Sequence, residues 1–332
     1  MKKQGLFWIS MLATFFLLVG CQSDEAGSDE IGDVKMVTGD QAGSWITIGA
    51  GIADGANDYF EGFPITATPG PGSVGNPATV STGEADIGMS YPPFLLEAKA
   101  GNEPFEEKMT NLRAVAALTQ TVVHLYQNAD MDAKSVEGLI SDKTQMTLGV
   151  PPAGQGSNYI SQIVFSSLGI EDAEKELEQW GASIYYGSGT DLVGGWKDRH
   201  VDAVMSTYNI PASAVEESLT AREGKIMDMG SSLVDILVEE RGFTEFTIPS
   251  GTYTGQDNEV HTVSLPIVLF AREDTPDEVI YNLTKSIYEN KESLEGVHNS
   301  FSNFNPENMA TGLGIQVHSG AEEFYTEMGL MD

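Results

Sequence analysis

The sequence has little cysteine and little positive charge, and each shortage excludes a class of protein. Cys21 is the only cysteine, so no internal disulfide can form. Lys and Arg number 17 against 49 Asp and Glu, which gives a formal net charge of −32. Nucleic acid and anionic lipid headgroups are therefore poor partners. The apolar run at residues 6–19 is shorter than the roughly 20 residues that a membrane-spanning helix needs.

Motifs of common enzymes and metal sites are missing as well. The 5 histidines form no H-E-x-x-H motif and no close pair with metal-ligand spacing. There is no G-x-S-x-G nucleophile motif, no G-x-x-x-x-G-K-[ST] phosphate loop and no D-x-[DN]-x-[DN]-G calcium loop. We therefore predict no catalytic residue, no metal site and no cofactor.

The N-terminal segment has the pattern of an export signal. Lys2 and Lys3 precede the apolar run, and small residues follow it up to Cys21. The sequence Leu-Val-Gly-Cys at residues 18–21 resembles a bacterial lipobox, in which the cysteine carries the lipid. We predict a lipoprotein signal peptide at residues 1–20, lipidation of Cys21, and a protein anchored by lipid to the outer face of the cell membrane. The acidic, aperiodic residues 21–33 should form a flexible tether.

The rest of the chain alternates short apolar runs, which end in Gly or Pro, with helix-like stretches. Such alternation predicts parallel βαβ units, with ligands at the carboxyl ends of the strands. Strands are expected at 34–39, 64–70, 85–91, 144–152, 182–187 and 202–207, and helices at 44–59, 73–82, 157–168, 190–199, 211–219, 276–290 and 321–328. Two longer apolar stretches, 112–129 and 261–274, would cross between lobes. The prediction is a hinged α/β protein with lobe 1 at 34–127 and 262–332, and lobe 2 at 128–261.

Three glycine-rich turns precede predicted helices, at residues 40–45, 69–76 and 151–158. Helix-start N–H groups, the helix dipole and a Ser hydroxyl together favour an anion, so the three turns could hold a carboxylate without any Lys or Arg. An uncharged or zwitterionic solute is also allowed. The predicted ligand-binding residues are Gly43, Ser44, Trp45, Ser73, Val74, Asn76, Ser90, Tyr91, Gly156, Ser157, Asn158, Tyr208 and Asn209.

The serines at helix starts, the two Asn in the turns, Trp45 and the residues at strand ends have purely structural alternatives. The three serines could be helix caps, the Asn side chains could cap or point outward, and Trp45 could belong to the core. Tyr91, Tyr208 and Asn209 could serve packing or the hinge. Arg113, the one basic residue near a predicted site segment, is expected in a structural ion pair.

Taken in order, these segments resemble the TAXI-type solute-binding proteins of tripartite ATP-independent periplasmic (TRAP) transporters. The resemblance rests on "TPGPGSVGN" (68–76), "TGEADIGMSYPP" (82–93), "LRAVAAL" (112–118), "LGVPPAGQGSN" (148–158), "RHVDAVMSTYNIPASAV" (199–215), "PSGTYTGQDNEVHTVSL" (249–265) and "HSGAEEFYTEMGL" (318–330). Departures occur at Ser44 and Trp45, where Thr and Tyr are usual, and at residues 90–93.

The resemblance implies a two-lobed periplasmic-binding-protein-like fold of type II, with two parallel-type sheets and flanking helices. It also implies a receptor that captures a dicarboxylate or an amino acid such as glutamate and delivers it to a sodium-driven membrane permease. Two alternatives use the same scaffold: a secreted enzyme acting on a small acid, and a sensor receptor with a signalling partner.

Overall fold

A computed structural model describes residues 32–39, 41, 44–60 and 65–331. The predicted signal peptide, Cys21 with nearly all of the tether, and Gly43 lie outside the described residues. Residues 32–332 form a single compact unit. Among the described residues, no helix is both long and apolar enough to cross a membrane.

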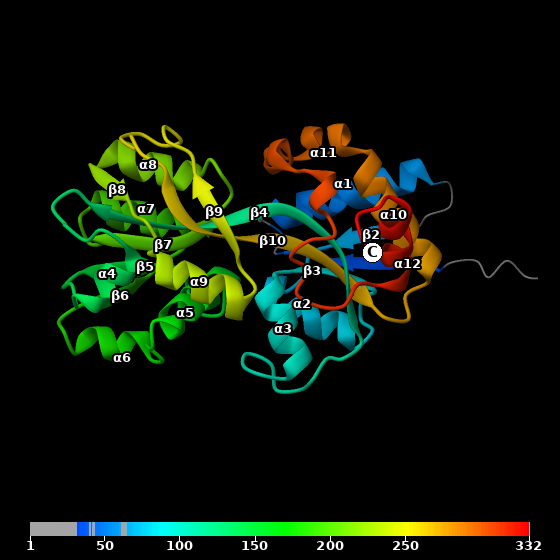
Figure 1. The fold of residues 1–332 in the computed structure, drawn as a ribbon, viewed down its shortest axis with the longest axis horizontal. Coiled ribbons are helices and arrows are strands. Elements are labelled where there is room, and N and C mark those ends of the chain that lie inside the picture. The colour runs from blue at the N-terminus through cyan, green and yellow to red at the C-terminus, as the bar shows by residue number, and fades with distance from the viewer. Residues whose placement is uncertain (1–31, 40, 42–43, 61–64, 332) are drawn as a thin grey trace, which may run out of the picture. The chain divides into compact units, whose positions relative to one another are not determined.

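Two groups of parallel strands with flanking helices make two lobes within this unit (Figure 1). Lobe 1 contains β1 (Val34–Val37), α1 (Ser44–Tyr59), β2 (Ile65–Thr68), α2 (Gly72–Ser81), β3 (Ile87–Ser90), α3 (Pro92–Ala100), α10 (Asp277–Glu289), α11 (Lys291–Val297), η1 (Asn299–Asn303), η2 (Pro306–Asn308) and α12 (Ser319–Glu327). Lobe 2 contains α4 (Val136–Ser141), β5 (Thr147–Val150), α5 (Gly156–Ser167), α6 (Ala173–Glu178), β6 (Ser183–Tyr186), α7 (Gly189–Lys197), β7 (Ala203–Tyr208), α8 (Ser213–Ala221), β8 (Gly224–Ile226), α9 (Ser231–Arg241) and β9 (Thr244–Ile248).

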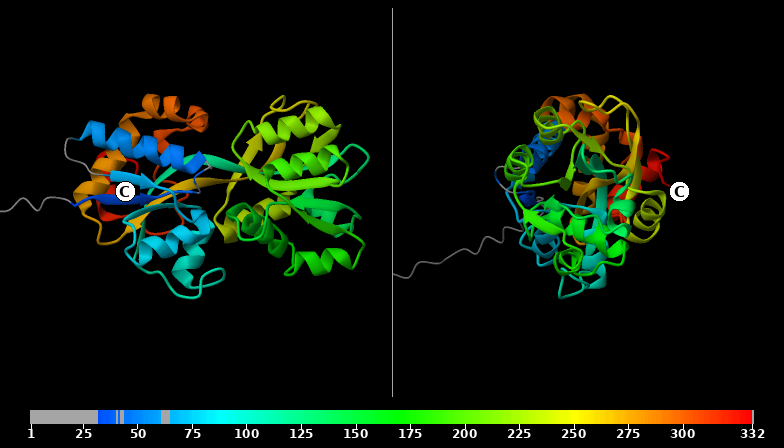
Figure 2. Two further views of the ribbon diagram at one scale, coloured as in Figure 1. Left: turned by 180° about the vertical axis from the view of Figure 1, so that it is seen from behind. Right: turned by 90° about the vertical axis from the view of Figure 1, so that its left-hand side faces the viewer.

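The lobes are joined by the long strands β4 (Leu112–Asn128) and β10 (Val260–Arg272), which both lie across the gap between them when the molecule is seen from behind (Figure 2). These strands pair antiparallel with each other and with β7 and β3, respectively. The parallel groups β2-β1-β3 and β7-β5-β6 are therefore continuous through the crossing pair, in one ten-stranded sheet. Both crossing strands are largely buried on both faces, so their sequences are nearly continuous apolar runs.

Helix burial follows the apolar spacing of the sequence. In α10, Val279, Ile280, Leu283 and Ile287 are buried on one face, while Asp277 lies in the first turn, where the helix dipole favours an acid. The predicted strands and helices are confirmed as elements. The helix α3 was not predicted; it begins at Pro92 directly after β3, and proline is well suited to the first turn of a helix.

Candidate functional site

A cavity of about 620 Å³ lies between the lobes, at the carboxyl ends of the parallel strands. Its described lining comes from the starts of α1, α2 and α5 and from the ends of β3 and β7. The lining residues are Gly39, Ser44, Trp45, Gly70, Pro71, Gly72, Ser73, Val74, Tyr91, Gly154, Gln155, Gly156, Ser157 and Thr207. We call this cavity the cleft.

Two helices open onto the cleft without a side-chain cap. In the described chain, no side chain caps α2, which follows Pro71, or α5, which follows Gln155. Ser73 and Ser157 are the second residues of these helices and do not cap them. Helix-start N–H groups have no intrahelical acceptor, so α2 from lobe 1 and α5 from lobe 2 present donors and positive dipole ends to the same space.

An aromatic pair forms one wall of the cleft. The rings of Trp45 and Tyr91 meet edge to face with centroids 5.2 Å apart. The Tyr91 hydroxyl donates to Thr121 Oγ1 at 3.3 Å, and burial raises the Tyr91 pKa to about 12. The phenol is therefore neutral at physiological pH, and Trp45, which is half-buried, supplies apolar surface beside the polar turns.

Asn76 and Ser90 lie beneath the cleft, outside its lining. Asn76 is fully buried, and its Nδ2 donates to the carbonyl oxygens of Thr38 and Met89, each at 2.8 Å. The Ser90 hydroxyl donates to the Ser73 carbonyl at 2.6 Å. These bonds connect the ends of β1 and β3 to α2, so both side chains hold the turns in place.

Three other predicted site residues lie elsewhere. Asn158 is buried; its Nδ2 donates to the Pro151 carbonyl at 2.8 Å. Tyr208 packs edge to face on His124, with centroids 5.6 Å apart, in the core of lobe 2. Asn209 lines a separate, smaller cavity.

Thr207, next to Tyr208, lines the cleft instead and was not predicted. The register of β7 on β4 explains the exchange: Thr207 pairs with Val123, and Tyr208 pairs with Val122. Neighbouring residues of a strand point to opposite faces, so only one of the two can face the cleft. Six further lining residues were not predicted, although all lie within or beside the predicted turns: Gly39, Gly70, Pro71, Gly72, Gly154 and Gln155.

The two lobes touch across the cleft. A Cβ built on Gly156 would lie 2.1 Å from Ser73 Oγ, so the start of α5 approaches α2 as closely as glycine permits. Nearby, the ring of Phe94 from α3 meets Tyr159 from α5 edge to face, with centroids 6.1 Å apart. The arrangement is that of two lobes in contact around the cleft.

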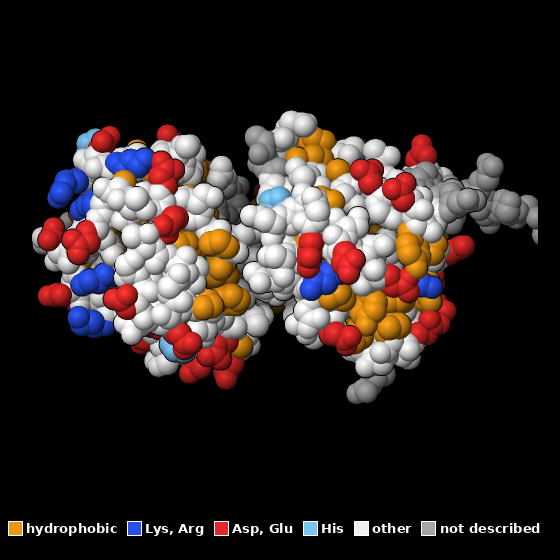
Figure 3. Space-filling view, turned by 90° about the horizontal axis from the view of Figure 1, so that it is seen from above, with side chains coloured by type: hydrophobic (Ala, Val, Ile, Leu, Met, Phe, Trp, Pro, Cys, Tyr) orange, Lys and Arg blue, Asp and Glu red, His pale blue; other side chains and the backbone are white. Residues whose placement is uncertain are grey.

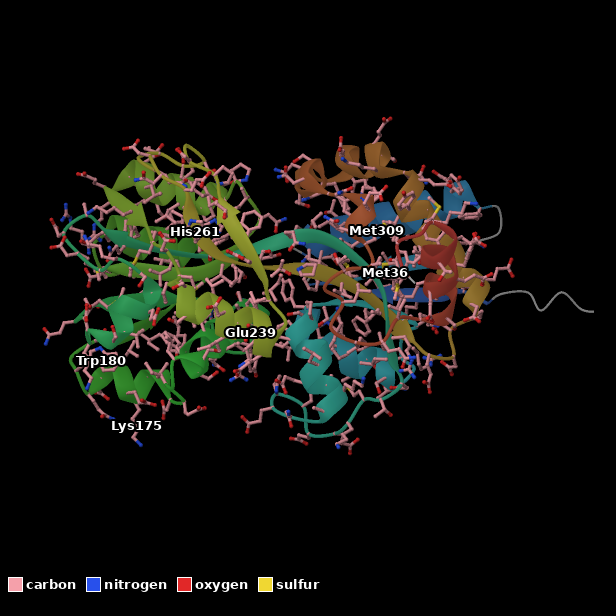
Figure 4. The ribbon with its side chains drawn as sticks, in the orientation of Figure 1. Met36, Lys175, Trp180, Glu239, His261 and Met309 are labelled. Carbon is pink, nitrogen blue, oxygen red and sulfur yellow. The ribbon has the colours of Figure 1, made fainter. Side chains whose placement is uncertain are left out.

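Charge is absent from the described lining of the cleft but abundant elsewhere. Acidic side chains are scattered over both lobes (Figure 3). Arg113 forms the expected structural ion pair, with 2.5 Å between its Nη2 and Glu273 Oε2. Lys175 lies on α6 and points outward from lobe 2 (Figure 4). No described group of three or more His, Cys, Asp or Glu is placed to hold a metal ion.

A larger cavity, of about 890 Å³, lies beside α8 and is lined mostly by lobe 2, with Asn299 from η1 of lobe 1. Its charged groups already have partners: Lys197 Nζ is 2.5 Å from Glu217 Oε1, and Glu216 accepts from the Thr254 amide at 3.0 Å. Size alone therefore does not make it the functional site. The cleft is smaller, but unsatisfied donors from both lobes converge on it.

The two lobes, the crossing strands and the interlobe cleft define the α/β fold of periplasmic solute-binding proteins. The chain belongs to the NMT1-like family, which matches residues 36–329. Its structure is similar to that of MatC from Rhodopseudomonas palustris with bound malate, at 15% identity and a TM-score of 0.52, over 90% of this chain and 96% of that one. It is also similar to a TctC solute-binding protein from Polaromonas without ligand, at 14% identity and a TM-score of 0.50, over 90% and 96% of the two chains.

Proposed function

We propose that this protein is an extracytoplasmic receptor that captures a small organic acid or amino acid, resembling a dicarboxylate or glutamate, in the interlobe cleft. It delivers the solute to the permease of a TRAP-type transporter, as a member of the TAXI subgroup. Lipid on Cys21 holds it at the outer face of the membrane, and the lobes are residues 34–127 with 262–332, and 128–261.

The observation that carries this proposal is the meeting of uncapped helix starts from both lobes on one cleft whose described lining is uncharged. An anion there accepts hydrogen bonds from α2 and α5 together, so binding favours the arrangement in which the lobes touch. A hydrogen bond to a charged group contributes roughly 1.5 to 3 kcal/mol. Four or five such bonds support micromolar binding after the ordering costs of association.

The net charge of −32 does not prevent capture of an anion. The acidic groups are spread over the surface, and salt screens them within about 8 Å at physiological ionic strength. Donors in the cleft act at hydrogen-bond distance with little water between. The hydrogen bonds in the cleft therefore outweigh the repulsion between an anionic solute and the acidic surface.

The organic-acid class is supported by the malate bound to MatC and by the family resemblance of the turns. An enzyme on this scaffold would need a general acid or base in the cleft. The described lining holds no Asp, Glu, His, Lys, Arg or Cys, and Tyr91, whose pKa is raised to about 12, stays protonated and is not available as a general base. A sensor receptor would share the cleft and differ in its membrane partner, so the membrane protein encoded beside this one separates the two.

A thermal-shift screen of dicarboxylates, amino acids and sugars tests the proposal. A solute at 100 times its Kd stabilises the folded protein by about 2.7 kcal/mol, and we expect dicarboxylates or acidic amino acids to raise the midpoint. With the best solute, Ser157→Ala should weaken calorimetric binding about tenfold, because one hydrogen bond to a charged group is lost.

Ser231→Ala is the matched control, since Ser231 also lies at a helix start in lobe 2 but outside the cleft. It should bind as wild type does. A screen in which sugars stabilise the protein while acids do not would contradict the proposal. Unchanged affinity in Ser157→Ala would remove the α5 turn from the site.

A further inference from the structure

A second, smaller cavity of about 130 Å³ lies at the hinge, on the other side of β4 from the cleft. Leu118, Gln120 and Val122 of β4 line it, whereas Thr121 between them accepts the Tyr91 hydroxyl at the cleft wall. This alternation places the two cavities on opposite faces of the strand. We call this second cavity the hinge pocket.

Both lobes contribute to the hinge pocket. Asn209 and Ile210 follow β7, and Phe246 lies on β9, all in lobe 2. The η1 and η2 turns of lobe 1 supply Ser300, Asn303, Phe304, Asn305 and Asn308. These turns are held against β4 by a hydrogen bond of 2.8 Å from the Ala117 amide to the carbonyl of Met309, which Figure 4 labels in lobe 1.

The lining is rich in carboxamides and, among the described residues, contains no charged side chain. Five of its twelve residues are Asn or Gln, namely Gln120, Asn209, Asn303, Asn305 and Asn308. A carboxamide offers two donors and an acceptor, so this set can satisfy a ligand that needs both. An ion would have no opposite charge to replace its hydration, and burying it there would be costly.

Gln120, Asn303, Asn305 and Asn308 are exposed to solvent and Asn209 is half-buried, so these amides can exchange water for a ligand. Asn305 accepts from the Glu307 amide at 3.2 Å, and Asn209 Oδ1 accepts from Thr121 Oγ1 at the long distance of 3.5 Å. In the described part of the chain, the side chains of Gln120, Asn303 and Asn308 make no hydrogen bond, and neither does the amide NH₂ of Asn209. Ile210, Phe246 and Phe304 supply apolar surface around these polar groups.

We propose that the hinge pocket is a second binding site, for a small uncharged molecule that both donates and accepts hydrogen bonds, such as a short amide, urea or a small polyol. The volume matches this class, since a water molecule occupies roughly 30 Å³ in the liquid and the pocket has room for only a few such units. The polar groups of the ligand pair with Asn303, Asn308 and the Asn209 NH₂.

Occupancy of the hinge pocket should influence the cleft, and this second step rests on the proposed function. A ligand that touches both lobes stabilises the interlobe arrangement that it fits, and coupling between two sites is reciprocal. The pockets are also joined by the hydrogen bonds from Tyr91 to Thr121 and from Thr121 to Asn209, at 3.3 and 3.5 Å. We therefore expect a filled hinge pocket to change the affinity of the cleft.

The binding test uses nuclear magnetic resonance of the side-chain NH₂ groups in the ¹⁵N-labelled protein without its signal peptide. Acetamide, urea and glycerol are titrated separately. We expect at least one of them to shift the Asn209 and Asn303 signals along a saturable curve. The variant Asn303→Leu with Asn308→Leu should weaken this binding at least tenfold.

Asn299→Leu is the matched control, because Asn299 is exposed at the start of η1 and does not line the hinge pocket. It should leave the curve unchanged. Shifts that rise linearly with all three probes, or that are equal in the double variant and wild type, would overturn the site and show a solvent effect only. If the double variant does not fold, Asn303→Ala replaces it with the same expected weakening.

A calorimetric titration of the cleft solute with and without the saturating probe tests the coupling. A shifted Kd supports it, and an equal Kd overturns the coupling while leaving the hinge pocket as a binding site. Failure of the proposed function is seen separately, because it would appear in the solute screen and in Ser157→Ala, which do not involve the hinge pocket.

Discussion

Gly156→Ala tests whether contact between the lobes is part of the solute-bound state. The new Cβ would lie 2.1 Å from Ser73 Oγ and 3.4 Å from Ser73 Cβ, so only the hydroxyl obstructs it severely. Either Ser73 must turn in a nearly buried site, or the lobes must separate by about 1 Å to restore ordinary contact distances. Overpacking of this kind costs about 1 to 3 kcal/mol, which corresponds to a loss of affinity of roughly 5- to 150-fold if the bound state alone carries the cost.

Isothermal titration calorimetry with the solute from the screen measures the loss, and X-ray scattering reports the lobe separation. Gly189→Ala is the matched control, because Gly189 begins α7 in lobe 2 and nothing lies within 4 Å of a Cβ added there. Gly156→Ala should cost much less affinity in a Ser73→Ala background than in the wild-type background, because the obstructing oxygen is then absent. Wild-type binding by Gly156→Ala, or an equal loss of affinity in the Ser73→Ala background, would refute this reasoning.

Three further outcomes are expected. Burial lowers the pKa of His124 from 6.5 to about 4, so between these pH values the imidazole is protonated in the unfolded chain but not in the folded protein. The free energy of unfolding should therefore fall by roughly 1.4 kcal/mol for each pH unit below pH 6.5. Denaturant titrations at pH 6.5 and 5.5 should show a smaller pH dependence of stability in His124→Gln than in the wild type, and an equal pH dependence in both proteins would contradict this. Asn76→Ala removes the side-chain donor to two buried carbonyl oxygens and should lower the free energy of unfolding by about 2 to 4 kcal/mol. A change near zero in urea denaturation would show that the end of β1 needs no such support. Cys21→Ser should move the protein from the membrane fraction to the soluble fraction, and retention in membranes would count against lipidation.

The elements that could be predicted from sequence are those with strong local patterns. Parallel strands and crossing strands bury both faces, so 112–129 and 261–274 appear as apolar runs, and β4 and β10 lie within one or two residues of these limits. The elements α3, α4, α6, α9, α11, β8 and β9 were not predicted. Of these, β8 and α6 have three and six residues, which give too little periodicity. Their presence depends on pairing and packing with distant segments.

The glycine-rich turns identified most of the cleft because their backbone forms it. Ser44, Trp45, Ser73, Val74, Tyr91, Gly156 and Ser157 were predicted for the site and line the cleft. Asn76 and Asn158 belong to the same turns, but their amides satisfy backbone carbonyl groups inside the lobes. Sequence spacing places a residue in a turn and leaves open whether its side chain faces the ligand or supports the turn.

The end of β7 shows the limit of sequence reasoning most clearly. Thr207 and Tyr208 are adjacent, and the apolar pattern of β7 does not show which of them faces the cleft. That choice is made by register with β4, since a shift of one residue would exchange the faces of the whole strand. The same register puts Tyr208 in the core beside His124, while Asn209, just beyond the end of β7, lines the hinge pocket. The composition of the hinge pocket therefore follows from the packing of segments that are distant in sequence, and no local motif predicts it.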